Sequence, residues 1–166
     1  MPYFLAYFFC FWSIDYFFVL LCRISIWILA RILAIDFGEK RTGIAVSDVL
    51  QLIANGLTTV DTSQLETFLA DYVAREPVEC FVVGLPKTLR GEPAAITAKL
   101  LTFVDKMRRR FPHIPVELVD ERFTSKMAFQ AMIDGGLKKK ARQNKAMIDQ
   151  VSATIMLEEY LERRRQ

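Results

Sequence analysis

The stretch RILAIDFGEKRTGIAVSD, residues 31–48, constrains the fold more than any other part of this sequence. It opens with an apolar run that is closed by Asp36, a pattern typical of a strand buried on both faces of a sheet. Gly38 and Gly43 then bracket a tight connection, and the run that follows alternates small residues with branched apolar ones. The stretch therefore predicts two antiparallel strands joined as a hairpin.

The rest of the chain alternates short apolar runs, typical of strands, with longer amphipathic segments, typical of helices. Ser63 with Glu66 three residues later predicts a capping box at the start of the first helix. The expected elements are a strand at 56–60, a helix at 63–75, a strand at 79–86, a helix at 94–111, a strand at 116–121, a helix at 124–133 and a terminal helix from 145. This order predicts an α/β fold: a ribonuclease H-like mixed five-stranded sheet flanked by helices, with an apolar N-terminal extension.

Residues 1–30 are an apolar leader, long enough to span a bilayer, which needs about 20 apolar residues. Three features argue against a membrane anchor: Asp15 falls in mid-span, no Lys or Arg precedes the run, and no flexible linker follows it. We favour a mis-assigned start, with the codon of Leu29 as an alternative bacterial start, over a membrane-anchor-like helix. The expected domain is 31–166. A tryptic peptide from residues 1–23 of the native protein would rule out the shorter product.

Charge is distributed unevenly along the chain. Residues 1–86 carry 5 Lys and Arg against 9 Asp and Glu, whereas residues 87–166 carry 17 against 10. A basic half indicates an anionic partner, with nucleic acid ahead of a membrane surface. The odd set of three cysteines has no metal-ligand spacing and fits a reducing, cytoplasmic location.

Acidic residues fall at the ends of the predicted elements. Asp36 closes the first strand, Asp120 and Glu121 close the strand at 116–121, and Asp149 lies early in the terminal helix. We expect the first and fifth strands to be neighbours, so that their carboxyl ends share one rim of the sheet. Small residues three and four positions after Asp149 would let that helix approach the same rim. Taken singly, each acid could instead end a turn, form a surface ion pair or stabilise a helix start.

Converging carboxylates repel one another unless a cation lies between them. Hard oxygen ligands select Mg²⁺ or Mn²⁺, which keep coordination positions open for water and phosphate oxygens. Two such ions about 3.5–4 Å apart can activate a water and stabilise the leaving oxygen of a phosphodiester. Acids of this kind in a chain with a basic half predict a two-metal nuclease.

Four ordered blocks, DFGEKRTGIAVSD, VVGLPKTLRGE, VDERFTSKMA and IDQVSATIMLEEYL, resemble the signature blocks of the YqgF/RuvX family. Its members are described as Holliday junction resolvases and as nucleases that mature the 16S rRNA precursor. The resemblance spans residues 31–166 and implies a ribonuclease H-like fold, and the leader departs from the family pattern. It also implies that Asp36 is the first metal-binding acid, that Asp120 or Glu121 is the second, and that Asp149 is the third. Because successive strand residues face opposite ways, we expect one member of the pair to point inward and favour Asp120.

Basic residues close to these acids are candidates for phosphate contacts. Each could also be an exposed loop residue or part of a structural ion pair. The candidates are Lys40, Arg41, Lys87, Arg90, Arg122, Lys138, Lys139, Lys140, Arg142 and Lys145.

The sequence leaves several functions open. The leading one is a metal-dependent nuclease that matures the 16S rRNA precursor. One alternative is a Holliday junction resolvase acting on branched DNA, for which a homodimer rather than a monomer is expected. Another is a non-catalytic nucleic-acid-binding factor that joins ribosomal precursor particles. A sugar-kinase-like ATPase is disfavoured because that architecture needs two such domains.

Overall fold

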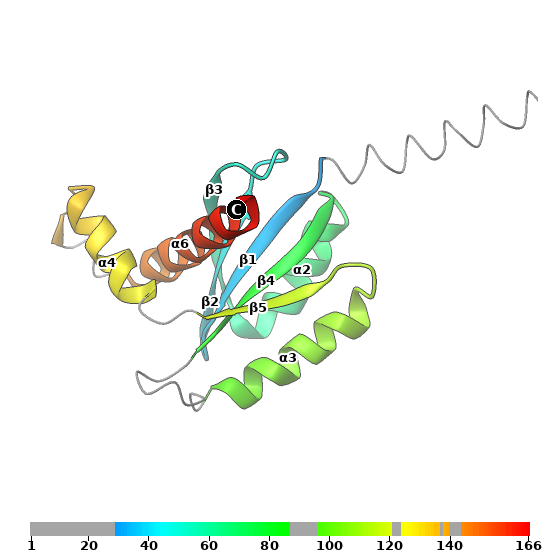
Figure 1. Cartoon of the computed structure of the whole chain (residues 1–166). Coiled ribbons are helices and arrows are strands. Elements are labelled where there is room, and N and C mark those ends of the chain that lie inside the picture. Colours follow the sequence, from blue (N-terminus) through cyan, green and yellow to red (C-terminus); the bar gives the residue numbers. More distant parts are fainter. Residues whose placement is uncertain (1–28, 87–95, 121–123, 137, 140–143) are drawn as a thin grey trace, which may run out of the picture.

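The structure is a computed structural model of the chain, and it describes residues 29–86, 96–120, 124–136, 138–139 and 144–166. Figure 1 shows a twisted sheet with helices on both of its faces. The predicted leader, apart from its last two residues, lies outside the described residues. Among the described residues, no helix combines the length and the apolar character that crossing a membrane requires.

The sheet has five strands in the order β3-β2-β1-β4-β5. The strands are β1 (Arg31–Phe37), β2 (Arg41–Ser47), β3 (Ala54–Asp61), β4 (Val78–Leu85) and β5 (Val116–Asp120). The first three pair antiparallel, whereas β4 is parallel to both β1 and β5. The predicted hairpin and mixed sheet are confirmed. The expected pairing of the first and fifth strands is wrong, because β4 lies between them; their carboxyl ends still share one edge, since all three strands run parallel.

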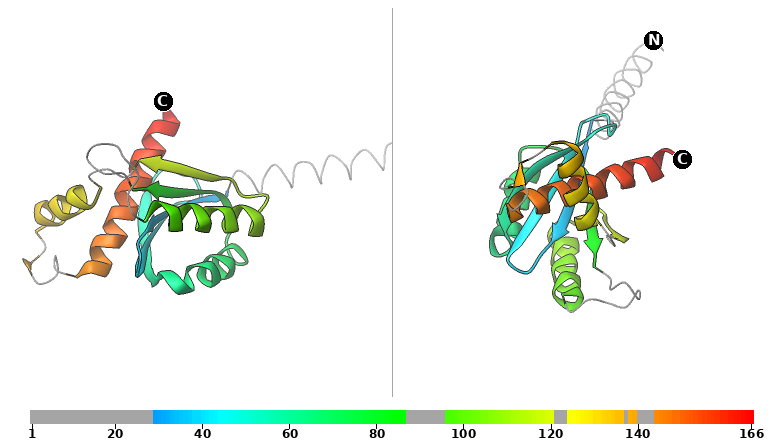
Figure 2. Two further views of the ribbon diagram at one scale, coloured as in Figure 1. Left: turned by 90° about the horizontal axis from the view of Figure 1, so that it is seen from below. Right: turned by 90° about the vertical axis from the view of Figure 1, so that its left-hand side faces the viewer.

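Helices cover the two faces of the sheet unequally (Figure 2). They are α2 (Leu65–Val73), α3 (Thr97–Arg110), α4 (Thr124–Asp134) and α6 (Lys145–Arg165). α2 and α3 lie on one face, and α6 crosses the other with α4 packed against it. The alternation along β1 explains both layers: Leu33 and Ile35 belong to the core under α2 and α3, while Ile32 and Ala34 belong to the core under α6.

The predicted capping box at Ser63 is wrong. Thr62–Gln64 forms a short 3-10 turn, and α2 begins at Leu65 after Gln64, which makes no capping hydrogen bond with its side chain. Leu65 and Leu69 are both fully buried in the core. Their burial fixes the phase and the start of the helix, and this tertiary constraint overrides the local capping signal.

The turn between β1 and β2 is tied to the layer behind it. A Cβ at Gly38 would lie 2.3 Å from the carbonyl oxygen of Arg41, so only glycine allows this tight turn. Thr62 Oγ1 donates a hydrogen bond to the Gly38 carbonyl at 2.7 Å, and the Thr62 N–H donates to the Lys40 carbonyl at 3.1 Å. The turn that follows Asp36 is therefore held by the segment that leads into α2.

Asp48 organises the loop between β2 and β3. Its Oδ1 accepts hydrogen bonds from the N–H groups of Leu52 at 2.6 Å and Ile53 at 2.8 Å, and Oδ2 accepts one from Leu50 at 3.1 Å. These backbone donors, that of Ile53 above all, hold the pKa of Asp48 below its ordinary value.

Candidate functional site

Asp36 and Asp149 converge on one rim of the sheet. Asp36 pairs with Gly43 across the β1–β2 hairpin, and directly paired residues on antiparallel strands face the same side. A Cβ on Gly43 would lie 2.0 Å from the backbone oxygen of Asp149, so α6 touches β2 at this residue. Paired Cα atoms are separated by about 5 Å, which places Asp36 one strand spacing from the point where Asp149 meets the sheet.

Two polar contacts fix the first turn of α6 beside this rim. Thr59, the partner of Gly43 on β3, donates a hydrogen bond from Oγ1 to the carbonyl of Ala146 at 2.7 Å. Asn144 caps the helix, because its side-chain oxygen accepts from the N–H of Ala146 at 3.1 Å. The position of Asp149 is therefore set by the backbone of α6 and by its contacts with β2 and β3.

The register of β5 separates Asp120 from Asp36. Asp120 pairs with Leu85, and Leu85 packs against the core under α2 and α3. Val119, one residue earlier, belongs to the core under α6, the face toward which Asp36 points. Asp120, the member of the Asp120/Glu121 pair that the sequence analysis favoured, therefore lies on the face opposite to Asp36. Glu121 lies outside the described residues.

Arg41 is the cation that the structure places against Asp149. Its Nε donates to Asp149 Oδ2 at 3.4 Å, and the two side chains are 40% and 31% exposed. Glu39 lies in the turn that precedes Arg41 and accepts a hydrogen bond from Lys99 on α3 at 2.8 Å. This hydrogen bond lowers the pKa of Glu39. Lys40, between Glu39 and Arg41, is exposed.

The other predicted phosphate-binding residues are only partly described. Lys138, Lys139 and Lys145 are exposed, and Lys145 is the first residue of α6, four positions before Asp149. A further set lies outside the described residues: Lys87, Arg90, Arg122, Lys140 and Arg142.

Sequence reasoning missed the roles of Gly43 and Thr59. The sequence pattern assigns Gly43 to the turn and Thr59 to an ordinary strand position, and only the strand register reveals that both face α6. The carboxylates of Asp36 and Asp149 are hard oxygen donors suited to Mg²⁺ or Mn²⁺. Within the described ranges, no group of three or more His, Cys, Asp or Glu side chains could hold a metal ion. Asp36 and Asp149 are the two predicted metal-binding acids that the described part of the chain brings to this rim.

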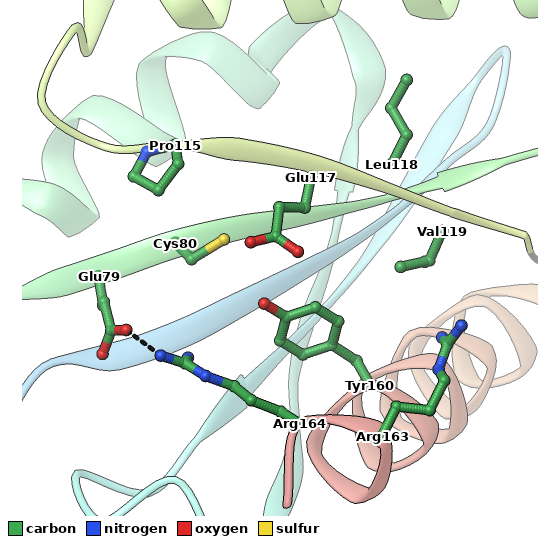
Figure 3. A pocket seen from close by; sticks show the side chains of 9 residues that line it. All are labelled: Glu79, Cys80, Pro115, Glu117, Leu118, Val119, Tyr160, Arg163 and Arg164. Atoms are coloured by element: carbon green, nitrogen blue, oxygen red, sulfur yellow. Dashed lines mark hydrogen bonds and ion pairs between the residues drawn. The ribbon is translucent and has the colours of Figure 1, made fainter. Parts of the chain in front are cut away.

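A separate cavity of about 490 Å³ lies against β4, β5 and the last turns of α6 (Figure 3). Tyr160 and Glu117 point toward the buried Cys80 thiol, and Arg164 pairs with Glu79 at one side. Burial raises the pKa of Cys80 to about 12 and also raises that of Tyr160. Tyr160 is eleven residues from Asp149, which is about 16 Å along a helix, so this cavity is distinct from the acidic rim.

A family model described as "RuvX: Holliday junction resolvase" matches residues 30–163. This chain belongs to the RuvX family. The match includes every described strand and most of the last helix. Membership confirms the family resemblance, the fold class and the nuclease class that the sequence predicted.

Relatives from several bacteria extend this match. Proteins named "Putative pre-16S rRNA nuclease" are 59% identical over 134 residues in Phocaeicola vulgatus and 57% identical over 137 residues in Bacteroides thetaiotaomicron. These alignments cover 81% and 82% of this chain, and 96% and 99% of the two relatives. Among solved structures, T. thermophilus RuvC in complex with a Holliday junction substrate matches with a TM-score of 0.52 at 21% identity, over 82% of this chain and 96% of that one. This structural likeness supports the fold.

Proposed function

We propose that this RuvX-family nuclease hydrolyses phosphodiester bonds in the 16S rRNA precursor with the help of Mg²⁺ or Mn²⁺. The observation that carries the proposal is the convergence of Asp36 and Asp149 on one rim, through the contact of Gly43 with the backbone of α6. The names of relatives more than 50% identical over nearly their whole length support the substrate.

We assign the metal-binding role to Asp36, Asp149 and one acid of the Asp120/Glu121 pair, with Glu121 favoured by the β5 register. β4 separates β1 from β5, so the third acid has to reach across two strand spacings, about 10 Å. The longer side chain of glutamate suits that span better than aspartate does. Gly84 on β4, which pairs with Val119, has no side chain to obstruct the space between β1 and β5.

A bound divalent ion would supply activation of a water and stabilisation of the leaving oxygen. The residues of the chain position the carboxylates and attract the substrate. Asp36 and Asp149 present carboxylate oxygens from a strand end and a helix face that are locked together by Gly43 and Thr59. Lys138, Lys139 and Lys145 add exposed positive charge near the start of α6, which attracts the phosphate backbone without reading its sequence.

The test compares wild type with Asp36→Asn on a 16S rRNA precursor and on a Holliday junction, in Mg²⁺ or Mn²⁺. We expect wild type to cleave the rRNA precursor and Asp36→Asn to lose cleavage while it still binds. Cleavage of the junction alone would support the second candidate, junction resolution, which the family description favours. Equal behaviour of the two proteins on both substrates would leave only a non-catalytic assembly factor.

The remaining assignments follow from this function. We propose a ribonuclease H-like domain over residues 31–166 and a cytoplasmic location where rRNA precursors are processed. Ribosomal precursor particles are the expected partners, and a monomer suffices for rRNA cleavage, whereas junction resolution calls for a homodimer. Mass spectrometry of the native N-terminus tests where the product begins, and size-exclusion chromatography tests the oligomeric state.

A further inference from the structure

Arg41 occupies an unusual position for a residue expected to bind phosphate. It is the first residue of β2, and its guanidinium donates to Oδ2 of Asp149, one of the two acids that converge on the rim. The same carboxylate oxygen is a candidate ligand for the divalent ion proposed above. A lone pair engaged by an arginine N–H is less available to a metal ion, and the two positive charges repel each other.

The backbone of Arg41 is fixed although its side chain is partly exposed. Its carbonyl oxygen packs closely against Gly38 in the tight turn, and the hydroxyl and N–H groups of Thr62 hold that turn by hydrogen bonds to the carbonyls of Gly38 and Lys40. The Arg41 side chain is 40% exposed, and its guanidinium lies at the end of a long, flexible stem. The guanidinium can therefore move from the Asp149 carboxylate to a nearby phosphate by rotation of side-chain bonds alone.

We propose that Arg41 is an exchangeable counter-ion that passes from Asp149 to a substrate phosphate when a divalent cation binds Asp149. Guanidinium and phosphate form strong paired hydrogen bonds, so the released arginine has a better acceptor than water. Metal binding and nucleic-acid binding are then coupled, and each tightens the other by the same factor. This inference depends on the metal site of the proposed function and adds a sequence of events to it. Arg41 neutralises Asp149 in the free protein, and the divalent cation then takes the place of Arg41.

The experiment measures Mn²⁺ affinity by calorimetry on the full chain, and the affinity for a labelled rRNA-precursor fragment with Ca²⁺ or with EDTA. Partly exposed ion pairs are worth a factor of about 2–5 in an equilibrium constant, so Arg41→Gln should tighten Mn²⁺ binding about 3-fold. We also expect RNA affinity to rise with Ca²⁺ in wild type, and Arg41→Gln should remove this gain. Arg41→Lys keeps the positive charge but lacks the planar guanidinium group. It should keep wild-type Mn²⁺ affinity and show a smaller Ca²⁺-dependent gain in RNA affinity.

Two matched variants separate this exchange from general electrostatics. Lys40→Gln removes the same charge from the adjacent residue, and Arg31→Gln removes a strand-end arginine that pairs with Glu76 at 3.2 Å at the far end of the sheet. The inference requires Arg41→Gln to tighten Mn²⁺ binding more than Lys40→Gln does, and Arg31→Gln to leave it unchanged. It is overturned if Arg41→Gln weakens Mn²⁺ binding or merely equals Lys40→Gln, which would make Arg41 a fixed structural partner of Asp149.

Thermal unfolding of each variant without metal verifies that it is folded. Wild type that binds no divalent cation would sink the proposed function itself. Normal metal binding with no difference among the variants would sink only the role of Arg41.

Discussion

Gly43→Ala tests the geometry of the rim most directly. The added Cβ would lie 2.0 Å from the backbone oxygen of Asp149 and 2.3 Å from its carbonyl carbon. Ordinary contact begins at 3.4 Å, so strand and helix must separate by about 1.4 Å. Both partners are backbone, which cannot rotate away. Overpacking of this kind costs about 1–3 kcal/mol, and a misplacement of about 1 Å in a catalytic site can cost about 100-fold in rate.

The assay is thermal unfolding together with the cleavage rate of the 16S rRNA precursor in Mg²⁺. We expect Tm to fall by about 3–10 °C and the rate to fall about 100-fold. Gly56→Ala is the matched control, because it faces the same helix from β3 but its Cβ would meet only the flexible side chain of Gln150 at 2.8 Å. If Gly43→Ala is as stable and as active as Gly56→Ala, the close approach of α6 to the rim does not position Asp149, and our reasoning is refuted.

Three further changes test the supports around the rim. Thr59→Val removes the hydrogen bond to Ala146 and should destabilise the protein by about 1 kcal/mol in urea titrations, with a loss of activity at the same time; an unchanged midpoint would contradict the role given to Thr59. Ser152→Ala should raise stability by about 1 kcal/mol in the same titrations, because the Ser152 hydroxyl is buried with no hydrogen-bond partner among the described residues; a loss of stability would reveal a partner. Asp48→Ala should destabilise the protein at pH 7 but not at low pH, because the pKa of Asp48 is lowered in the folded state. The stability that the Asp48 carboxylate contributes is fully present above its ordinary pKa of 3.8 and is lost as the pH falls through its folded-state pKa. Unfolding curves of both proteins at pH 7 and pH 3 give the comparison, and a pH-independent difference would exclude the carboxylate as its source.

Local patterns sufficed for much of the fold. The apolar run before Asp36 and the glycines after it predicted the hairpin, and the alternation of strand and helix patterns predicted the mixed sheet. The Ser63 capping signal failed because the burial of Leu65 decides where α2 starts. Strand order failed in one detail, because β1 and β5 have no local feature that shows which strand lies between them.

The site was less accessible to sequence reasoning. The acids at element ends were visible, and the structure brings Asp36 and Asp149 together. The face on which Asp120 lies depends on its pairing with Leu85, which no pattern within residues 116–121 reveals. The pairing of Arg41 with Asp149 joins residues 108 positions apart, so it also emerges only from the fold.

The hydrogen bonds from Thr62 to the turn after Asp36 have a mechanical consequence. A substrate strand that pulls on Lys40 loads the peptide segment entering α2 as well as the hairpin tip, because the two are fastened together. Under the proposed function, a nucleic acid that contacts this corner would meet a stiff edge and would itself have to bend.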